Sequence, residues 1–266
     1  MSNTSLRWLS LVLLDQPKMP AGAALEQSFQ ELFPGEVKLT VSSAAERIVI
    51  CTLGQQADDF TAAITLVEQP VPWQQLEGPC ETARYWPEAV ATLKDHQAHL
   101  MVTLIDEGTK SLDKSIALTQ LVAATVAASE SATGVFWGPG RLVHPRDGFL
   151  GQAEQVQPEN LPLFLWIDFR VEKVEADGTE TVRLYTTGLE ALGQTEIEVD
   201  QFNGTPQELL EYAYNIAHYL LIGSKAVEDS HTIGLTDELQ AVVTRGPSFL
   251  DPELEVLQLR LEVPTE

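Results

Sequence analysis

The chain has 266 residues, with 39 Asp and Glu against 16 Lys and Arg and a formal net charge of −23. This balance argues against binding nucleic acid or an anionic membrane, because both require a basic surface that displaces counterions. Apolar residues make up 44% of the chain, enough for the core of one large or two ordinary domains. The composition therefore predicts a folded protein that would attract a basic partner.

The cysteine content and the start of the chain favour a cytoplasmic location. Cys51 and Cys80 are the only cysteines, too few for a disulfide framework, and we expect both thiols to be buried and inert. An apolar run over residues 6–14 ends at Asp15, whereas a secretory signal continues apolar nearly to its cleavage site. We interpret this run as a strand, and no run approaches the roughly 18 apolar residues of a membrane span.

The first half of the chain predicts four strands and two helices. The strands are the runs rich in apolar or β-branched residues at 6–14, 47–53, 61–67 and 99–105. Leu25, Phe29 and Leu32 recur at the spacing of one helical face, and a second helix is predicted over 85–93. The resulting order, βαββαβ over residues 6–106, predicts the ferredoxin-like split βαβ arrangement.

The middle of the chain predicts a long helix followed by a linker. Several prolines and glycines indicate a stiff loop over residues 70–80. A helix with a broad apolar face begins near Ser111, and a short strand is predicted between Gly134 and Gly140. Residues 144–160 are polar and contain further glycines and prolines, so they are predicted to be a linker or surface loop.

The second half predicts an antiparallel α+β domain. Strands are expected at 163–174, 181–186, 195–199, 239–244 and 254–261, with a hairpin turn at Asp177-Gly178. Thr205, Pro206 and Glu208 form a capping box at the start of a helix that ends at Gly223. We therefore predict an α+β protein with an N-terminal domain at 1–143 and an acidic C-terminal domain at 161–266.

The strongest candidate for catalytic chemistry is a group of His, Cys and Glu residues. His96 and His99 follow Cys80 and Glu81, and a thiolate–imidazole pair of Cys80 with His99 would be a nucleophile. The alternative is structural: His96 stabilises a helix C-terminus and His99 is satisfied at a sheet edge. Two histidines fall short of the three or four ligands of a typical metal site, so no metal is expected.

The glycine spacing of the middle segment does not indicate a cofactor. Gly134, Gly138 and Gly140 lack both the Gly-Lys-Ser/Thr ending of a P-loop and the spacing of a dinucleotide fingerprint. A tight turn is the expected role of this segment. We therefore expect no cofactor.

One strand of the second half is a candidate partner-binding surface. In the run 195–200, Glu196, Glu198 and Asp200 alternate with apolar residues, which places the three acids on one face of a strand. An acidic face of this kind suits a basic protein partner.

Two blocks of sequence resemble a known bacterial family. The first block contains Pro70-Val71-Pro72-Trp73, Leu76-Glu77-Gly78-Pro79-Cys80, Trp86-Pro87-Glu88-Ala89 and His96-Gln97-Ala98-His99-Leu100. The second contains Thr186-Thr187-Gly188-Leu189-Glu190-Ala191-Leu192-Gly193, Glu196-Ile197-Glu198, Asn215-Ile216-Ala217-His218-Tyr219-Leu220-Leu221 and His231-Thr232-Ile233-Gly234. Together they resemble the family called domain of unknown function 4261, whose C-terminal domain would cover about 186–262. The resemblance implies a bacterial cytoplasmic protein and brings no catalytic residues.

Three functional hypotheses follow from these patterns. The first is a non-enzymatic protein-binding module, such as an immunity or regulatory protein, that binds a basic partner through its acidic surface. The alternative is a hydrolase-like or metal-dependent enzyme that uses His96 or His99 with Cys80, Glu81 or Asp106. The third is a homodimer that buries exposed aromatic residues. The sequence leaves the enzyme question open and favours the first hypothesis.

Overall fold

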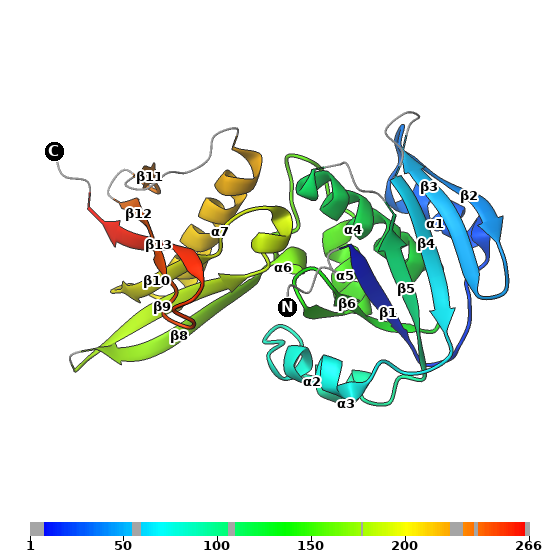
Figure 1. The fold of residues 1–266 in the computed structure, drawn as a ribbon, viewed down its shortest axis with the longest axis horizontal. Helices are drawn as coiled ribbons and strands as arrows, with labels where there is room; N and C mark the ends of the chain where they lie inside the picture. Colours follow the sequence, from blue (N-terminus) through cyan, green and yellow to red (C-terminus); the bar gives the residue numbers. More distant parts are fainter. Residues whose placement is uncertain are drawn as a thin grey trace. The chain divides into compact units, whose positions relative to one another are not determined.

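The computed structural model describes residues 8–54, 60–105, 110–176, 178–223, 231–236 and 239–263. It contains helices and two sheets, which confirms the predicted α+β class. The chain divides into two compact units, residues 1–166 and 167–266, coloured blue to green and yellow-green to red in Figure 1. Within the described ranges, no helix is long and apolar enough to cross a membrane.

The first unit is built on an antiparallel sheet with the strand order β2-β3-β4-β5-β1-β6-β7. Its strands are β1 (Leu9–Leu14), β2 (Lys38–Ala44), β3 (Ile48–Gly54), β4 (Phe60–Val67), β5 (Ala98–Leu104), β6 (Ala132–Trp137) and β7 (Leu142–Pro145). The run 11–14 of β1 is buried throughout, as expected for a strand covered on both faces.

Helices lie on both faces of this sheet (Figure 1). They are α1 (Gly22–Leu32), α2 (Trp73–Glu81), α3 (Ala89–Leu93), α4 (Ser111–Ala127), α5 (Arg146–Ala153) and α6 (Leu163–Trp166). Leu11 and Leu13 share a core cluster with Leu76 of α2 and Leu93 of α3. Because side chains alternate along a strand, the residues between them face the side of the sheet against which α4 packs.

The strand order corrects the ferredoxin-like prediction. The split βαβ arrangement pairs the first strand with the strand before the second helix, which would join β1 to β4. Instead β4 pairs with β3 and β5, and β1 pairs with β5 and β6. The cause is β2, a largely exposed edge strand that the apolar pattern did not reveal. After α1 the chain enters the sheet at this edge and returns strand by strand to β5.

Two segments predicted as irregular are helical. The stiff loop expected over 70–80 contains α2, whose Leu76 and Cys80 are buried. The predicted linker at 144–160 contains the end of β7 and α5, whose Phe149 and Ala153 are buried in the first unit. Pro145 stands at the position before the first helical residue, where its fixed φ does not oppose a helix. That the two halves fold as independent domains stays a prediction.

The second unit contains a six-stranded sheet with the order β11-β12-β13-β10-β9-β8. Its strands are β8 (Asp168–Ala176), β9 (Thr179–Thr187), β10 (Ile197–Phe202), β11 (Thr232–Gly234), β12 (Gln240–Pro247) and β13 (Glu255–Glu262). All neighbours are antiparallel except β10 and β13, which are parallel. Ala176 pairs with Thr179 across the predicted hairpin turn, while Asp177 itself lies outside the described residues.

The helix α7 (Pro206–Ile222) covers one face of the second sheet (Figure 1). Its start is the predicted capping box: the Thr205 hydroxyl accepts from the Glu208 N–H, and the Glu208 carboxylate accepts from the Thr205 N–H. Tyr214 of α7 packs against Phe169 of β8 with ring centroids 6.0 Å apart. The face of the sheet that carries Phe169 is therefore the core face of this unit.

Candidate functional site

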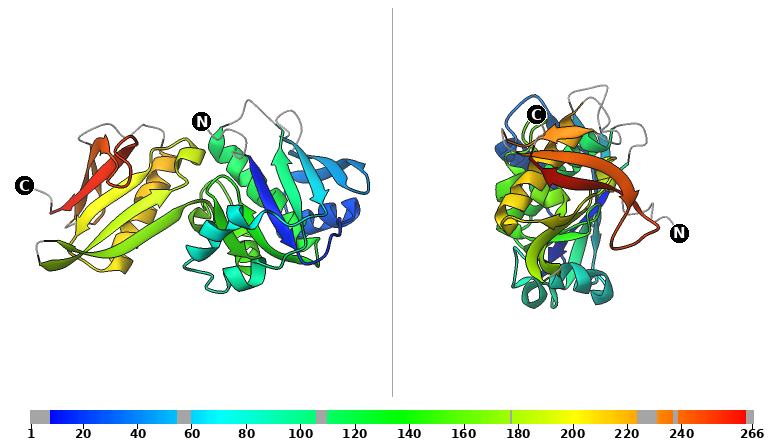
Figure 2. Two further views of the ribbon diagram at one scale, coloured as in Figure 1. Left: turned by 60° about the horizontal axis from the view of Figure 1, so that its bottom comes forward. Right: turned by 90° about the vertical axis from the view of Figure 1, so that its left-hand side faces the viewer.

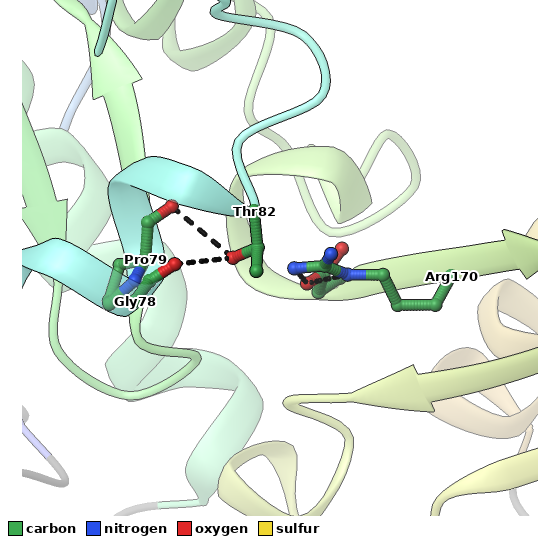
Figure 3. Close-up of polar contacts among 5 residues, drawn as sticks. Gly78, Pro79, Thr82 and Arg170 are labelled. Atoms are coloured by element: carbon green, nitrogen blue, oxygen red, sulfur yellow. Dashed lines mark hydrogen bonds and ion pairs between the residues drawn. The ribbon is translucent and has the colours of Figure 1, made fainter. Parts of the chain in front are cut away.

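Cys80 lies in the core of the first unit. Its side chain belongs to the cluster that contains Leu11 and Trp86. Burial, reinforced by the charge of Glu81, raises the pKa of the Cys80 thiol to about 11. The thiol is therefore protonated at neutral pH, whereas a nucleophilic cysteine needs its thiolate. The end of α2 is closed by the Thr82 hydroxyl, 2.9 Å from the Gly78 carbonyl oxygen (Figure 3).

His96 is a buried residue that bonds two backbone groups. Its Nε2 accepts a hydrogen bond from the Val71 N–H at 2.8 Å, and its Nδ1 lies 2.6 Å from the Leu93 carbonyl oxygen. The first bond makes Nε2 an acceptor, so Nδ1 carries the proton and donates to Leu93. With both ring nitrogens engaged, His96 joins the segment before α2 to the end of α3.

His99 lies inside the sheet, which corrects the expected edge position. It stands on β5 opposite Leu13 of β1 and Val67 of β4. Its Nδ1 lies 3.0 Å from the Gln69 carbonyl oxygen. Burial lowers the pKa of His99, the bond to Gln69 opposes this, and His96 lowers it further. Among the described residues, no group of three or more His, Cys, Asp or Glu is placed to hold a metal ion. Asp106 lies outside the described residues.

The first unit also contains an open cavity of about 820 Å³. It lies near the C-terminal ends of α1 and α5 and is lined by Glu31, Leu32, Phe33, Pro34, Gly35, Glu36, Val37, Gln120, Glu154, Gln155, Val156 and Gln157. Three of these lining residues are glutamates and none is basic, so the charge of the lining does not favour an anion.

The second unit carries a row of polar residues on the sheet face opposite α7. The strand register places Arg170, Tyr185, Glu198, Gln258 and Thr244 side by side across β8, β9, β10, β13 and β12. Their neighbours along the strands point to the core face, since side chains alternate. Of the three predicted acidic residues, the register places Glu198 in this row, whereas Glu196 precedes β10 and the pairing of β10 with β9 shifts after Val199.

Glu196 is engaged within the unit. Its Oε1 accepts from the N–H groups of Gly188 and Glu190 at 2.8 and 3.0 Å, and its Oε2 accepts from the Thr186 hydroxyl at 2.8 Å. The carboxylate thus holds the turn between β9 and β10, including the short helix Glu190–Leu192. This structural role was not predicted.

Glu198 is buried, with only 3% of its surface exposed. Its two carboxylate oxygens accept from the Ser248 hydroxyl and from the Phe249 N–H, the latter at 2.9 Å. Glu198 is therefore covered, because the connection between β12 and β13 folds back over it. That Glu198 contacts a partner stays a prediction. Asp200 is the one residue of the predicted acidic trio that is exposed.

The connection between β12 and β13, residues 248–254, packs on the polar face through Phe249. The Phe249 and Tyr185 rings are nearly perpendicular, with centroids 6.1 Å apart, and the Arg183 guanidinium carbon lies 5.1 Å from the centre of the Phe249 ring. Arg183 also pairs with Glu172 at 2.7 Å. A sequence of Ser and Asp between two prolines signals a turn, but no local pattern indicates that this turn covers Glu198.

The basic residues of the second unit are paired with carboxylates of the same unit. All five Lys and Arg that the structure describes there form ion pairs: Arg170–Asp168, Lys173–Glu180, Arg183–Glu172, Arg245–Glu255 and Arg260–Glu262. Figure 3 shows the Arg170 guanidinium in its pair. Exposed carboxylates remain outside these pairs, at Glu175, Asp200, Glu211, Asp251 and Glu253.

Residues 185–260 match the family model described as Domain of unknown function (DUF4261). The match confirms the resemblance of the second block and covers β10, α7, β12 and most of β13. The first block lies outside the matched residues, so its resemblance stays a prediction. The comparison with curated proteins finds no match, and neither does the comparison with solved structures.

Proposed function

We propose that the chain is a non-enzymatic binding protein whose acidic second unit engages a basic protein partner. The observation that carries this proposal is the charge pairing of that unit. Residues 167–266 hold 20 Asp and Glu against 6 Lys and Arg, and each basic residue described there already has an acidic partner. Among the described residues of this unit, no Lys or Arg is outside such a pair, so the remaining exposed carboxylates are available to counterions or to a basic partner.

Such a surface favours rapid association with a basic protein. An excess of one charge steers an oppositely charged partner and raises the association rate steeply at low salt. Nucleic acid and anionic membranes are repelled by the same field. An immunity or regulatory role in a bacterial cytoplasm is the specific form of the proposal, and the two free, buried cysteines suit a reducing compartment.

The enzyme alternative depends on residues that the first unit uses for its own structure. A thiolate at Cys80 is disfavoured by burial, and His96 has both ring nitrogens bonded to the backbone. A general base needs a ring nitrogen within reach of a substrate proton. These contacts support the binding proposal over a hydrolase that would use Cys80 with His96.

The test is a pull-down with the tagged full chain from lysate of its own source organism, washed first at low and then at high salt. A stoichiometric basic protein released by salt and identified by mass spectrometry is the expected result. A matched bait with Glu175, Asp200 and Glu211 replaced by their amides should retain less of it. If the amide bait captures as much, the acidic surface is not the binding determinant. Light scattering of the eluted chain alone would reveal a homodimer instead.

A further inference from the structure

The connection between β12 and β13 exposes two leucines. Leu250 and Leu254 are 54% and 57% exposed, although both belong to a segment, 239–263, that the structure describes without a break. The other exposed large apolar residues of this unit, Tyr219, Ile222 and Val263, lie close to the ends of described ranges. The two leucines are therefore exposed apolar side chains that belong to the connection itself.

The backbone of this connection is held by internal hydrogen bonds. The Ser248 N–H donates to the Leu254 carbonyl oxygen at 2.8 Å, and the Leu254 N–H donates to that of Asp251 at 2.9 Å. The Ser248 hydroxyl accepts from the N–H groups of Leu250 and Asp251 at 3.0 and 3.3 Å while it donates to buried Glu198. Figure 2 shows the connection, in orange to red, at the end of the two long strands that it joins.

The exposed leucines are interleaved with carboxylates. Asp251 and Glu253 lie between Leu250 and Leu254, and Glu255 follows. Glu255 pairs with Arg245 at 3.1 Å, whereas the Asp251 carboxylate accepts the Glu253 N–H at 3.1 Å, a bond that leaves its negative charge in place. The connection therefore presents apolar side chains and net negative charge together.

We propose that residues 248–254 are the docking element for a partner segment that carries both basic and apolar side chains, such as a cationic amphipathic helix. This inference rests on the proposed function and specifies its surface. The leucines would bury apolar area against the segment, and Asp251 and Glu253 would face its Lys or Arg residues. A second copy of this chain is a poor occupant, since each copy carries a net charge of −23.

A docking element of this kind gains from being ordered before it binds. Ordering a loop on binding costs conformational entropy, and a loop already fixed avoids most of that cost. Here Glu198, Ser248 and the Phe249 ring fix the connection on the sheet while the two leucines stay exposed.

The experiment measures fluorescence anisotropy of two labelled peptides that bind the full-length protein. Both peptides have the same length and carry the same number of lysines on one helical face. The first peptide carries leucines on the opposite face, and its control carries serines there. The wild type should bind the leucine peptide more tightly. Leu250→Ser/Leu254→Ser should lower the affinity for the leucine peptide by about tenfold, as expected from lost apolar contact, and leave the affinity for the serine peptide unchanged. Asp251→Asn/Glu253→Gln should lower the affinity for both peptides and reduce the salt dependence of their binding.

The matched control is Glu36→Gln/Glu154→Gln, which removes the same charge from the cavity of the first unit. Unchanged circular dichroism and urea midpoints would establish that each variant is folded. If both loop variants bind like the wild type, the docking element is wrong. The acidic binding function of the second unit then still stands if Glu175→Gln/Asp200→Asn/Glu211→Gln binds weakly, and it fails if only the cavity variant of the first unit does. If the wild type binds neither peptide even at low salt, both proposals fail.

Discussion

The two units use the faces of their sheets differently. In the first unit, β1 is apolar at nearly every position and helices cover both faces. In the second, α7 covers one face, and the other carries the row from Arg170 to Thr244. The contrast teaches that a polar face is not the same as an exposed face: Glu198 lies on the polar side and is nearly as buried as a core leucine.

The largest expected effect compares one leucine from each unit. Leu13→Ala should lower the free energy of unfolding by about 2–5 kcal/mol, because this fully buried side chain leaves a cavity between sheet and helices. Leu254→Ala removes the same atoms from a mostly exposed position and should change it by less than about 0.5 kcal/mol. Urea denaturation of both variants measures the difference, and similar losses would contradict the assignment of Leu254 to the surface.

His144 should make the stability of the first unit depend on pH. It is buried beside Phe149, with Nε2 3.2 Å from the Leu165 carbonyl oxygen, and burial lowers its pKa to about 4. In the unfolded chain this histidine is protonated near its ordinary pKa of about 6.5. The free energy of unfolding is therefore highest above that pH and decreases by about 3 kcal/mol as the pH falls toward 4.

The measurement is the urea midpoint of wild type and His144→Gln between pH 7 and 4.5. The variant should lose this part of the pH dependence whatever its stability at pH 7. An unchanged slope in His144→Gln would show that another group causes the acid sensitivity.

Glu198 and Asp200 test the difference between a polar and an exposed position on one strand. Glu198→Ala leaves the Ser248 hydroxyl and the Phe249 N–H without their acceptor and should cost about 1–3 kcal/mol. Asp200→Asn should stay within about 0.5 kcal/mol. Hydrogen exchange of the Phe249 amide should accelerate in the first variant alone; protection equal to the wild type would contradict the anchoring role of Glu198.

The smallest expected effect concerns the start of α7. Thr205→Ala should cost about 1 kcal/mol at pH 7 because it removes the side-chain acceptor of the capping box. Hydrogen bonds from Thr205 hold the pKa of Glu208 below its usual range. The stabilisation that the ionised Glu208 contributes is thus complete above the ordinary pKa of a glutamate and is lost as the pH falls through its lower pKa in the folded protein. Thermal unfolding of Thr205→Ala at pH 7 and at a pH below the folded pKa of Glu208 measures this contribution. Gln207→Ala is the control and should have little effect at either of these two pH values.

Local pattern was enough for elements whose signal lies in adjacent residues. The capping box of Thr205 and Glu208 predicted the start of α7, and Gly223 predicted its end. The run at 6–14 predicted β1 in the same way. Each of these signals is a short-range preference that a chain segment expresses wherever it lies.

Local pattern failed where burial came from distant segments. The strand β2 is an exposed edge without an apolar stripe, and α2 forms despite Pro79 because Leu76 and Cys80 bury themselves in the core. The predicted linker likewise became α5 through the burial of Phe149. In each case tertiary contact outweighed local propensity, which is a weak preference.

The sequence by itself determined the class, the acidic charge and an alternation over residues 195–200 that predicts Glu196, Glu198 and Asp200 on one side of a strand. Only the tertiary structure decided which of these acids faces solvent. Glu198 is covered because Ser248 and Phe249, about fifty positions later in the chain, donate hydrogen bonds to it. Alternation fixes the side of a sheet to which a residue points, but whatever covers that side comes from elsewhere in the chain.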